Sequence, residues 1–525
     1  METREQAPAA GQGRYKWEVL MVVMVGTMMA ALDTSIVNIS LPNIMADFGS
    51  TIQDIEWVAT GYMIAFAVFI PLSAWIRGRM GSRNLYLAAI GLFTVGSVLC
   101  GFAWSLPSLI AARVIQAVGG GAVTPTGMAM VSEVFAPHER GKAMGFWSMG
   151  VIIGPATGPT LGGYLTQAIG WRSIFFVNVP FGILVLLAGS ALLRREAPQD
   201  GHRPFDFWGF LFLSLCLTGF LLGTSKGEED GWGSAFIVGC FAASGLGLAG
   251  FLLVESLVPH GIMDLDLFRN RVFTACILVT IGRTIAMFGA TFLIPLFTQN
   301  LMGFDALQSG LLLLPGSLLL IVLMPLGGRL ADRLGPRYLV MAGTLGIAFF
   351  MYLFRALGAD SSAWDVIWPT FIRSAAMALM AAPLMATALN AIPLRKAAQA
   401  SAVINLIQQV GGAAGIAVLS TFLENRQAFQ MGTLASQLRA NSPAYARALA
   451  PLARHGLDLG LGPAQAHGFA AAALDRLIGL ASSVRGFDDT FLFGAVLILI
   501  TGLPVFLLPS TRVVHAKAFD GGAMD

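Results

Sequence analysis

The sequence predicts an all-α integral membrane protein with fourteen transmembrane helices, and three observations lead to this prediction. Of the 525 residues, 56% are apolar and only 12% are charged, whereas an ordinary soluble protein has about 25% charged residues. The apolar residues are gathered into runs of roughly the 20 residues that a spanning helix requires. Basic residues mark every second connection between these runs. The bilayer must therefore be the solvent for most of the chain.

The runs are expected to be helices, because in lipid only helices and closed barrels satisfy the backbone polar groups, and these runs are too long for barrel strands. The first run follows Arg14 and Lys16 but is too long for a signal peptide, so we expect an uncleaved first span. In chain order the predicted spans are 19–41, 57–76, 84–104, 108–131, 143–165, 174–193, 207–225, 234–256, 272–296, 309–328, 338–357, 368–391, 401–423 and 490–508.

The basic residues also predict the orientation, because cytoplasmic loops retain Lys and Arg. With the N-terminus inside, most of the 32 basic residues fall in inside segments, and the short outside loops hold only Arg172 and Lys226. Both termini are therefore predicted to be cytoplasmic. The segment 424–488 is long enough to escape this rule, and we expect a partly helical outer loop there.

Two similar halves are indicated by features that recur eight spans apart. The basic turn at 78–83 returns at 328–337, and Arg113 in span 4 has a counterpart, Arg373, in span 12. Basic turns alone recur in many polytopic proteins, but the matched arginines favour a repeat. Repeat transporters bind substrate between their halves near the midplane. The predicted units are 1–193 with spans 1–6, 194–271 with inserted spans 7–8, and 272–525 with spans 9–14 and the outer loop 424–488.

The candidate proton site consists of Asp33 and Arg113. A charge deep in a span costs about 2.5–3.5 kcal/mol or more, so each one needs a reason. Asp33 is the only acidic residue well inside a span, and Arg113 lies at a similar depth in another span. Burial favours the protonated form of a carboxyl, whereas a nearby arginine favours the charged form. A movement of Arg113, or a bound substrate, could therefore load or release a proton; a static salt bridge is the alternative.

Span 5 carries a stripe of glycines at every fourth position, together with two prolines. Such a stripe permits close helix approach, and each proline removes a backbone donor and bends the helix. We expect this face to form a sliding interface between the halves, with motionless glycine packing as the alternative. The residues of this conformational motif are Gly150, Gly154, Pro155, Gly158, Pro159 and Gly162.

No cofactor or metal is expected. The four cysteines lie in apolar runs and the histidines have no ligand-like spacing. A phosphate-binding loop of the G-x-x-x-x-G-K-[ST] type is absent from the sequence, so the proton gradient is the expected source of energy. The net charge of +3 is too small to suggest a nucleic-acid partner. Three deep arginines, including Arg283 near the middle of span 9, against one acid favour neutral or weakly acidic lipophilic substrates.

Several motifs resemble those of the fourteen-span drug:proton antiporters of the major facilitator superfamily. Residues 32–38, followed by Leu41-Pro42, resemble the signature of the first span, and residues 113–116 look like the span 4 motif. The stretch 154–163 is similar to the antiporter motif of span 5, and residues 171–180 fit the pattern that opens span 6. The closest resemblance is to the EmrB type, which also has a long outer loop before its last span.

This resemblance implies a proton-coupled antiporter in the inner membrane that exports lipophilic small organic compounds. Asp33 and Arg113 would couple the proton. An EmrA-like periplasmic adaptor and an outer-membrane channel would be partners in a cell with two membranes. The candidate substrate-binding residues are Asn38, Gln116, Arg283 and Arg373.

The first basic turn departs from the family pattern, because Gly78 stands where the family has an aspartate. The cytoplasmic gate is therefore expected at the second copy, with Asp332, Arg333 and Gly335. Alternatives remain open: export of a specific natural metabolite, siderophore or fatty acid, proton-coupled import, a channel, or a membrane enzyme, for which no paired catalytic groups are evident.

Overall fold

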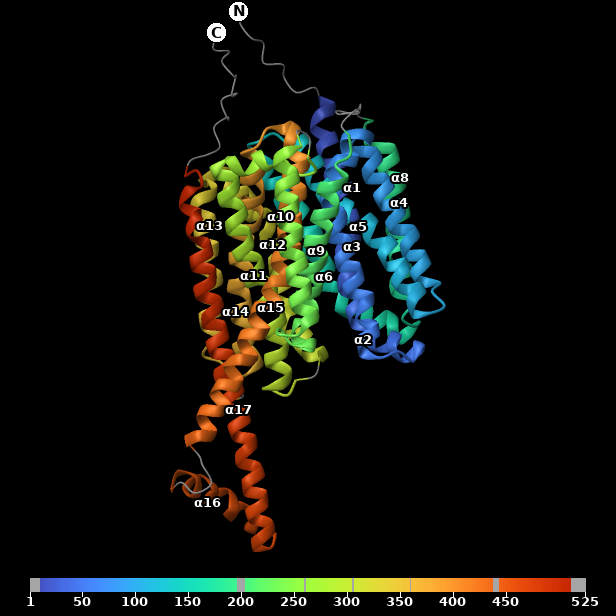
Figure 1. The fold of residues 1–525 in the computed structure, drawn as a ribbon. Helices are drawn as coiled ribbons and strands as arrows, with labels where there is room; N and C mark the ends of the chain where they lie inside the picture. Colours follow the sequence, from blue (N-terminus) through green and yellow to red (C-terminus); the bar gives the residue numbers. More distant parts are fainter. Residues whose placement is uncertain are drawn as a thin grey trace, which may run out of the picture.

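The computed structural model describes residues 10–195, 204–258, 261–304, 306–358, 360–437 and 443–510, and these ranges contain helices but no strand. The long helices run side by side through one bundle (Figure 1). The bounds are α1 Ala10–Phe48, α2 Ile52–Ile55, α3 Trp57–Met80, α4 Ser82–Gly101, α5 Leu106–Val134, α6 Arg140–Ala168, α7 Ser173–Phe176, α8 Asn178–Leu192, α9 Phe207–Asp230, α10 Ala235–Leu257, η1 Leu265–Arg269, α11 Arg271–Asn300, α12 Ala306–Leu334, α13 Pro336–Phe354, α14 Ala363–Asn390, η2 Leu394–Lys396, α15 Ala397–Gln437, α16 Pro443–Asp458, α17 Pro463–Gly502 and η3 Leu503–Leu507.

Within the described ranges, 13 helices are long and apolar enough to cross a membrane. The predicted fifth span corresponds to α6, which has 29 residues but is rich in glycine and proline and hence less apolar. α6 packs along α1 and α12 inside the bundle. Together with α6, the thirteen apolar helices account for the fourteen spans expected from the sequence.

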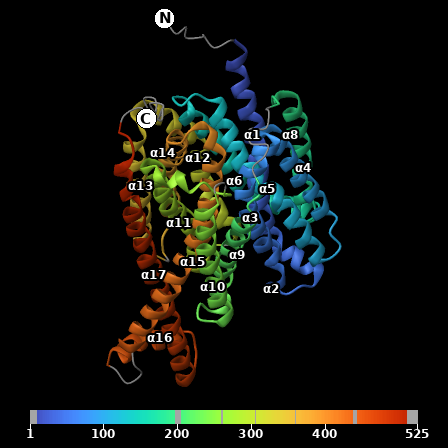
Figure 2. The same cartoon turned by 45° about the horizontal axis from the view of Figure 1, so that its top comes forward.

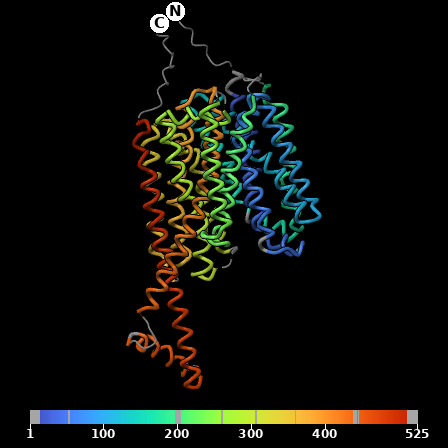
Figure 3. The backbone as a smooth tube through the Cα atoms, in the orientation of Figure 1, coloured from blue at the N-terminus to red at the C-terminus, as the bar shows by residue number. Residues whose placement is uncertain are grey.

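The bundle has two ends that the later sections refer to by name. The terminal face is the end at which α1 begins and η3 ends, and the distal face is the end that carries α2 and α16 (Figure 3). The N-terminal half comprises α1 and α3–α8, and the C-terminal half comprises α11–α15 and α17. The inserted helices α9 and α10 pack against each other, and α9 also contacts α3 and α15.

The backbone supports the internal repeat. The two basic turns each place a glycine in the left-handed region directly before the next helix: Gly81 has φ 78° and ψ 161°, and Gly335 has φ 87° and ψ 152°. Each preceding helix contains a proline at the same distance from its glycine, Pro71 in α3 and Pro325 in α12. Only glycine adopts such a positive φ at little cost, so the two turns require the same residue for the same reason.

The glycine stripe of α6 packs against α1 and therefore lies within the N-terminal half. A Cβ on Gly154 would lie 2.4 Å from the backbone nitrogen of Leu32, and one on Gly158 would lie 2.6 Å from Ser35 Oγ. The prediction that the stripe forms the sliding interface between the halves is thus wrong. The spacing correctly indicates a close helix contact, but spacing does not identify which helix fills it.

A different pair of glycines on α6 does contact the other half. Gly141 and Gly145, near the start of α6, approach α12: added Cβ atoms would lie 2.6 Å from Gly328 O and 2.7 Å from Met324 O, respectively. The first turns of α6 therefore approach the C-terminal half so closely that a side chain would not fit.

The predicted outer loop is mostly helical in its described part. α15 and α17 are 41 and 40 residues long and continue past the bundle at the distal face (Figure 1). α16 packs against α17 through a small apolar cluster of its own, which includes Leu449 and Leu474. The projection is thus formed by extensions of two spanning helices with a short third helix attached.

We expect Gly154→Ala to destabilise the protein by about 1–3 kcal/mol, because overpacking a tight contact forces neighbouring atoms to shift. The matched control is Gly163→Ala on the same helix, where a Cβ meets nothing within 4 Å. Thermal unfolding of the two purified variants in detergent measures the difference. Equal melting temperatures would show that the contact between α6 and α1 is looser than described.

Candidate functional site

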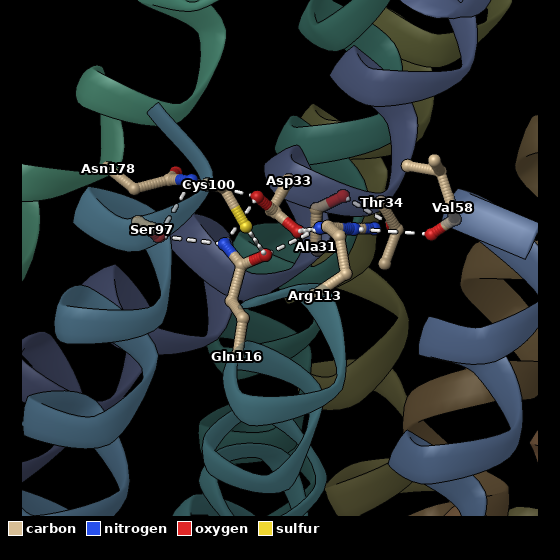
Figure 4. A network of polar contacts seen from close by, with 9 residues as sticks. All are labelled: Ala31, Asp33, Thr34, Val58, Ser97, Cys100, Arg113, Gln116 and Asn178. Atoms are coloured by element: carbon tan, nitrogen blue, oxygen red, sulfur yellow. Dashed lines mark hydrogen bonds and ion pairs between the residues drawn. The ribbon is translucent and has the colours of Figure 1, made fainter. Parts of the chain in front are cut away.

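The polar centre of the N-terminal half is a network around Asp33, halfway along α1 (Figure 4). Its partner Arg113 lies about two turns into α5, a helix that begins with a capping box at Ser105. Arg113 Nη1 donates to Asp33 Oδ2 at 2.5 Å, and the two side chains are 2% and 0% exposed. The structure therefore brings together the two residues predicted as the proton site, in a fully buried ion pair.

Two amides complete the shell of donors around the carboxylate. Gln116 Nε2, also from α5, donates to Asp33 Oδ1 at 2.8 Å, and Asn178 Nδ2 from α8 donates to the same oxygen at 2.9 Å. Ser97 Oγ from α4 accepts from Gln116 at 2.7 Å. These side chains come from α1, α4, α5 and α8 and point toward one another in Figure 4. Asp33 thus accepts three hydrogen bonds, an arrangement that stabilises an ionised carboxylate.

The remaining contacts of Arg113 hold its guanidinium in one place. Its carbon Cζ lies 3.9 Å from the centre of the Tyr62 ring, within the range of a cation–π interaction. Its Nη1 donates to Gln116 Oε1 at 2.6 Å, and its Nε donates to the carbonyl of Val58 at 3.4 Å. Arg113 therefore loses only part of its stabilisation if Asp33 becomes neutral.

The sequence did not predict a functional role for three members of this network: Asn178, Ser97 and Tyr62. Asn178 belongs to the motif that opens span 6, and the other two are single polar residues in apolar runs. Their depth in the spans was available from the sequence. Their rotation toward Asp33 was not, because it depends on how the helices pack.

The four candidate substrate residues do not form one site. Gln116 is buried in the Asp33 network, whereas Asn38 is exposed one turn farther along α1. Arg373 donates to Thr291 Oγ1 on α11 at 3.3 Å. Arg283 is 5% exposed and its Nε has no partner. Among the described residues, no hydrogen bond or ion pair joins either Arg283 or Arg373 to an acid.

At the terminal face, the predicted gate residue Asp332 joins the two halves. Its carboxylate accepts from the backbone nitrogens of Gly141 at 3.1 Å and Lys142 at 2.9 Å, at the start of α6. The N-terminus of a helix favours a negative charge, so this contact stabilises closure of the terminal face. Figure 2, with that face turned forward, shows α6 beside α12.

The neighbourhood of this contact distinguishes the two basic turns. Arg140 Nη1 donates to Asn390 Oδ1 at 2.6 Å, which adds a second polar link between the halves. Gly335 permits the turn after α12, and Arg333 is exposed in the last turn of that helix. In the first copy, Arg77 pairs with Glu133 and donates to Ser82, all within the N-terminal half. Asp332 of the second copy reaches across to α6, at the position where the first copy has Gly78.

The comparisons with known proteins agree with a polytopic transporter fold. The model of the family described as Major Facilitator Superfamily matches residues 23–416, and the chain belongs to this family. A Multidrug resistance protein B homolog of Mycobacterium tuberculosis is 31% identical over 95% of this chain and 91% of its own length. The Multidrug export protein EmrB of Escherichia coli is 31% identical, over 79% of this chain and 82% of its own.

Further matches extend this result. The Tetracenomycin C resistance and export protein of Streptomyces glaucescens is 32% identical over 80% of this chain and 78% of its own. Among solved structures, the proton:xylose symporter XylE and the human organic anion transporter MFSD10 each have a TM-score of 0.61 at 14% identity. They cover 95% of this chain and 97% and 100% of their own, respectively. At that identity they show the fold alone.

We expect Arg113→Gln to lower the free energy of unfolding by about 3–5 kcal/mol, because it leaves a buried carboxylate without its counter-charge. Adding Asp33→Asn should recover much of this loss, since the second change removes the unpaired charge. The control is Arg14→Gln, which alters an exposed ion pair with Glu18 and should cost about 1 kcal/mol or less. Thermal unfolding of Arg113→Gln, Asp33→Asn, the double variant and Arg14→Gln measures the coupling; strictly additive effects of the first two changes would contradict it.

We expect Asp332→Ala to open the terminal face, because it removes both hydrogen bonds to the start of α6. Spin labels on Asn84 of the N-terminal half and Leu394 of the C-terminal half, both exposed, should report a longer distance in the variant. Asp264→Ala is the control, since Asp264 pairs with Lys396 near the same face without joining α6 to α12. An unchanged distance distribution in Asp332→Ala would remove the gate assignment.

Proposed function

We propose that this chain is a proton-coupled antiporter that exports lipophilic small organic compounds from the cytoplasm. The observation that carries the proposal is the fully buried carboxylate of Asp33, with an arginine and two amides as donors. A charge at this depth is costly and marks an ion or proton pathway more often than a structural element. The names of the multidrug resistance and export relatives support the direction of transport.

The mechanism follows from the electrostatics of the pair. A proton that reaches Asp33 removes its negative charge and leaves Arg113 as an uncompensated cation in the interior. The arrangement with the lowest free energy then changes, and the halves can rock to the alternative conformation. Release of the proton on the cytoplasmic side restores the ion pair. Proton and substrate exclude one another if bound substrate favours the ionised arrangement.

The terminal face is the proposed cytoplasmic side, with both termini in the cytoplasm and the chain in the inner membrane. Support comes from the basic residues, because Arg77, Arg140 and Lys142 lie at that face, as the retention of positive charge inside requires. The contact of Asp332 with α6 then closes the cytoplasmic side. The described conformation is accordingly an outward-facing or occluded one.

The substrate class follows from the charge of the two halves. Asp33 and Arg113 neutralise each other, whereas Arg283 and Arg373 of the C-terminal half lack an acidic partner among the described residues. The interior thus carries net positive charge, which favours neutral or weakly acidic lipophilic compounds over multiply charged cations. The proton gradient supplies the energy, without a cofactor.

The projection formed by the ends of α15 and α17, together with α16, is the proposed attachment point for a periplasmic adaptor of the EmrA kind. It extends beyond the bundle at the distal face (Figure 1). In a cell with two membranes the adaptor would continue to an outer-membrane channel. The resemblance to EmrB-type proteins is the support for these partners.

A second candidate function is export of one natural metabolite. It is favoured by the Streptomyces glaucescens relative, whose name attributes to it both resistance to and export of tetracenomycin C. A producer cell needs such an exporter for a single compound. A panel of unrelated drugs distinguishes the two functions, because a single-compound exporter would transport few of them.

In inside-out membrane vesicles with an acidified interior, we expect addition of a transported drug to dissipate the pH gradient, because each import of drug releases protons. Asp33→Asn should abolish this response, since the amide cannot carry the proton. Asp47→Asn, which alters a partly exposed carboxylate at the end of the same helix, should retain it. A full response from Asp33→Asn, measured with a pH-sensitive dye, would rule out coupling at this residue.

A further inference from the structure

In the side-chain amide of Asn178, the nitrogen is hydrogen-bonded and the oxygen is not. At the start of α8, its Nδ2 donates to Asp33 Oδ1 at 2.9 Å and more weakly to Ser97 Oγ at 3.5 Å. Its oxygen Oδ1 is buried and has no hydrogen-bond partner. A buried acceptor left unpaired is destabilising, and a native structure rarely keeps one without a reason. The unused oxygen belongs to a side chain that touches the candidate proton carrier.

In the other amide of the network, that of Gln116, both the oxygen and the nitrogen are hydrogen-bonded. Gln116 Oε1 accepts from Arg113 at 2.6 Å and from the thiol of Cys100 at 3.8 Å, while its Nε2 donates to Asp33 and Ser97. Turning Gln116 would break all of these contacts. Turning Asn178 breaks two, one of them weak. Asn178 is therefore the amide that can rotate at low cost.

A protonated Asp33 needs a hydrogen-bond acceptor, which its partners in the described arrangement do not offer. An ionised carboxylate only accepts, and its partners Arg113, Gln116 and Asn178 all donate to it. Once protonated, one oxygen becomes a donor and requires an acceptor. A half turn of the Asn178 amide exchanges its oxygen and nitrogen, and it then presents Oδ1 to the acid without any movement of the backbone.

Ser97 can support both orientations. Its oxygen accepts from Gln116 and Asn178 in the described state, and its hydroxyl proton can be donated to Asn178 Oδ1 after the turn, because a hydroxyl both donates and accepts. The other titratable groups facing Asp33 are Tyr62 of α3 and Cys100 of α4, and both are uncharged near neutral pH. Arg113 stays charged throughout.

We infer that Asn178 is a positioning residue that follows the protonation state of Asp33, donating to the carboxylate and, after a half turn, accepting from the carboxylic acid. The inference rests on the proposed function in so far as Asp33 takes up a proton during transport. Its consequence is that both protonation states of Asp33 are hydrogen-bonded. Hydrogen bonding then stabilises both the ionised and the protonated state, so the carboxyl can take up and release a proton.

Infrared difference spectroscopy of the purified full-length protein in lipid, recorded between high and low pH, tests the inference. The carbonyl stretch of protonated Asp33 is the band that disappears in Asp33→Asn and shifts on labelling with carbon-13 aspartate. In the wild type we expect this band at the lower wavenumber of a hydrogen-bonded carboxylic acid. In Asn178→Leu, which has similar size and no polar group, it should move to the higher wavenumber of a free acid.

Asn84→Leu, at an exposed site on α4, is the matched control and should leave the band unchanged. A wild-type band already at the free-acid position would overturn the inference, even if Asn178→Leu failed to fold. So would a band that does not move in a folded Asn178→Leu protein.

Transport by Asn178→Leu should fall about tenfold or more, the factor expected for one hydrogen bond to a charged group. The infrared result does not depend on transport. If Asp33→Asn still exchanged drug for protons, coupling at Asp33 would be ruled out, whereas the position of the infrared band would still decide the assignment of Asn178.

Discussion

An isolated carboxylate in the middle of a membrane protein persists only where donors surround it, and Asp33 obtains them from two other helices. The guanidinium of Arg113 and the amides of Gln116 and Asn178 replace the water that the carboxylate would have at a surface. This requirement fixes the rotation and depth of α1 against α5 and α8. On its opposite side, α1 rests on the glycine stripe of α6, where backbone contact leaves no room for adjustment.

The two halves share a fold but differ in charge, and the difference suggests a division of work. Arg113 on α5 meets an acid on α1, whereas Arg373 on α14, the counterpart of α5, contacts the hydroxyl of Thr291 and the ring of Phe350 and has no acidic partner among the described residues. The N-terminal half therefore holds a neutralised pair that a proton can disrupt. The C-terminal half holds Arg283 and Arg373, which have no acidic partner among the described residues, and in the proposed function a substrate would lie near them. Proton and cargo would then act on different halves of one molecule.

The sequence predicted the spans, the repeat and the contact of Asp33 with Arg113, because each depends on composition or on depth along a helix. It did not predict that Asn178 and Ser97 point at Asp33, since the rotation of a helix is set by its packing partners. The glycine stripe shows the same limit. Its four-residue period indicates that another helix packs closely against it, but the period does not tell whether that helix is α1 or a helix of the other half. Gly78 and Asp332 occupy equivalent positions in the two basic turns. Because the first copy has a glycine at this position, the difference predicted that the gate lies at the second copy.

The position of α6 explains how events at Asp33 can reach the terminal face. Its first turn contacts α12 through Gly141 and donates two backbone hydrogen bonds to the carboxylate of Asp332, while its glycine stripe packs along α1. Because both contacts are backbone-close, a shift of α1 relative to α5 cannot be absorbed by side chains and must move α6. That movement changes the geometry at Asp332, whose two hydrogen bonds require the start of α6 in one place. In the proposed function, loss of charge at Asp33 and opening of the gate would thus be linked through α6.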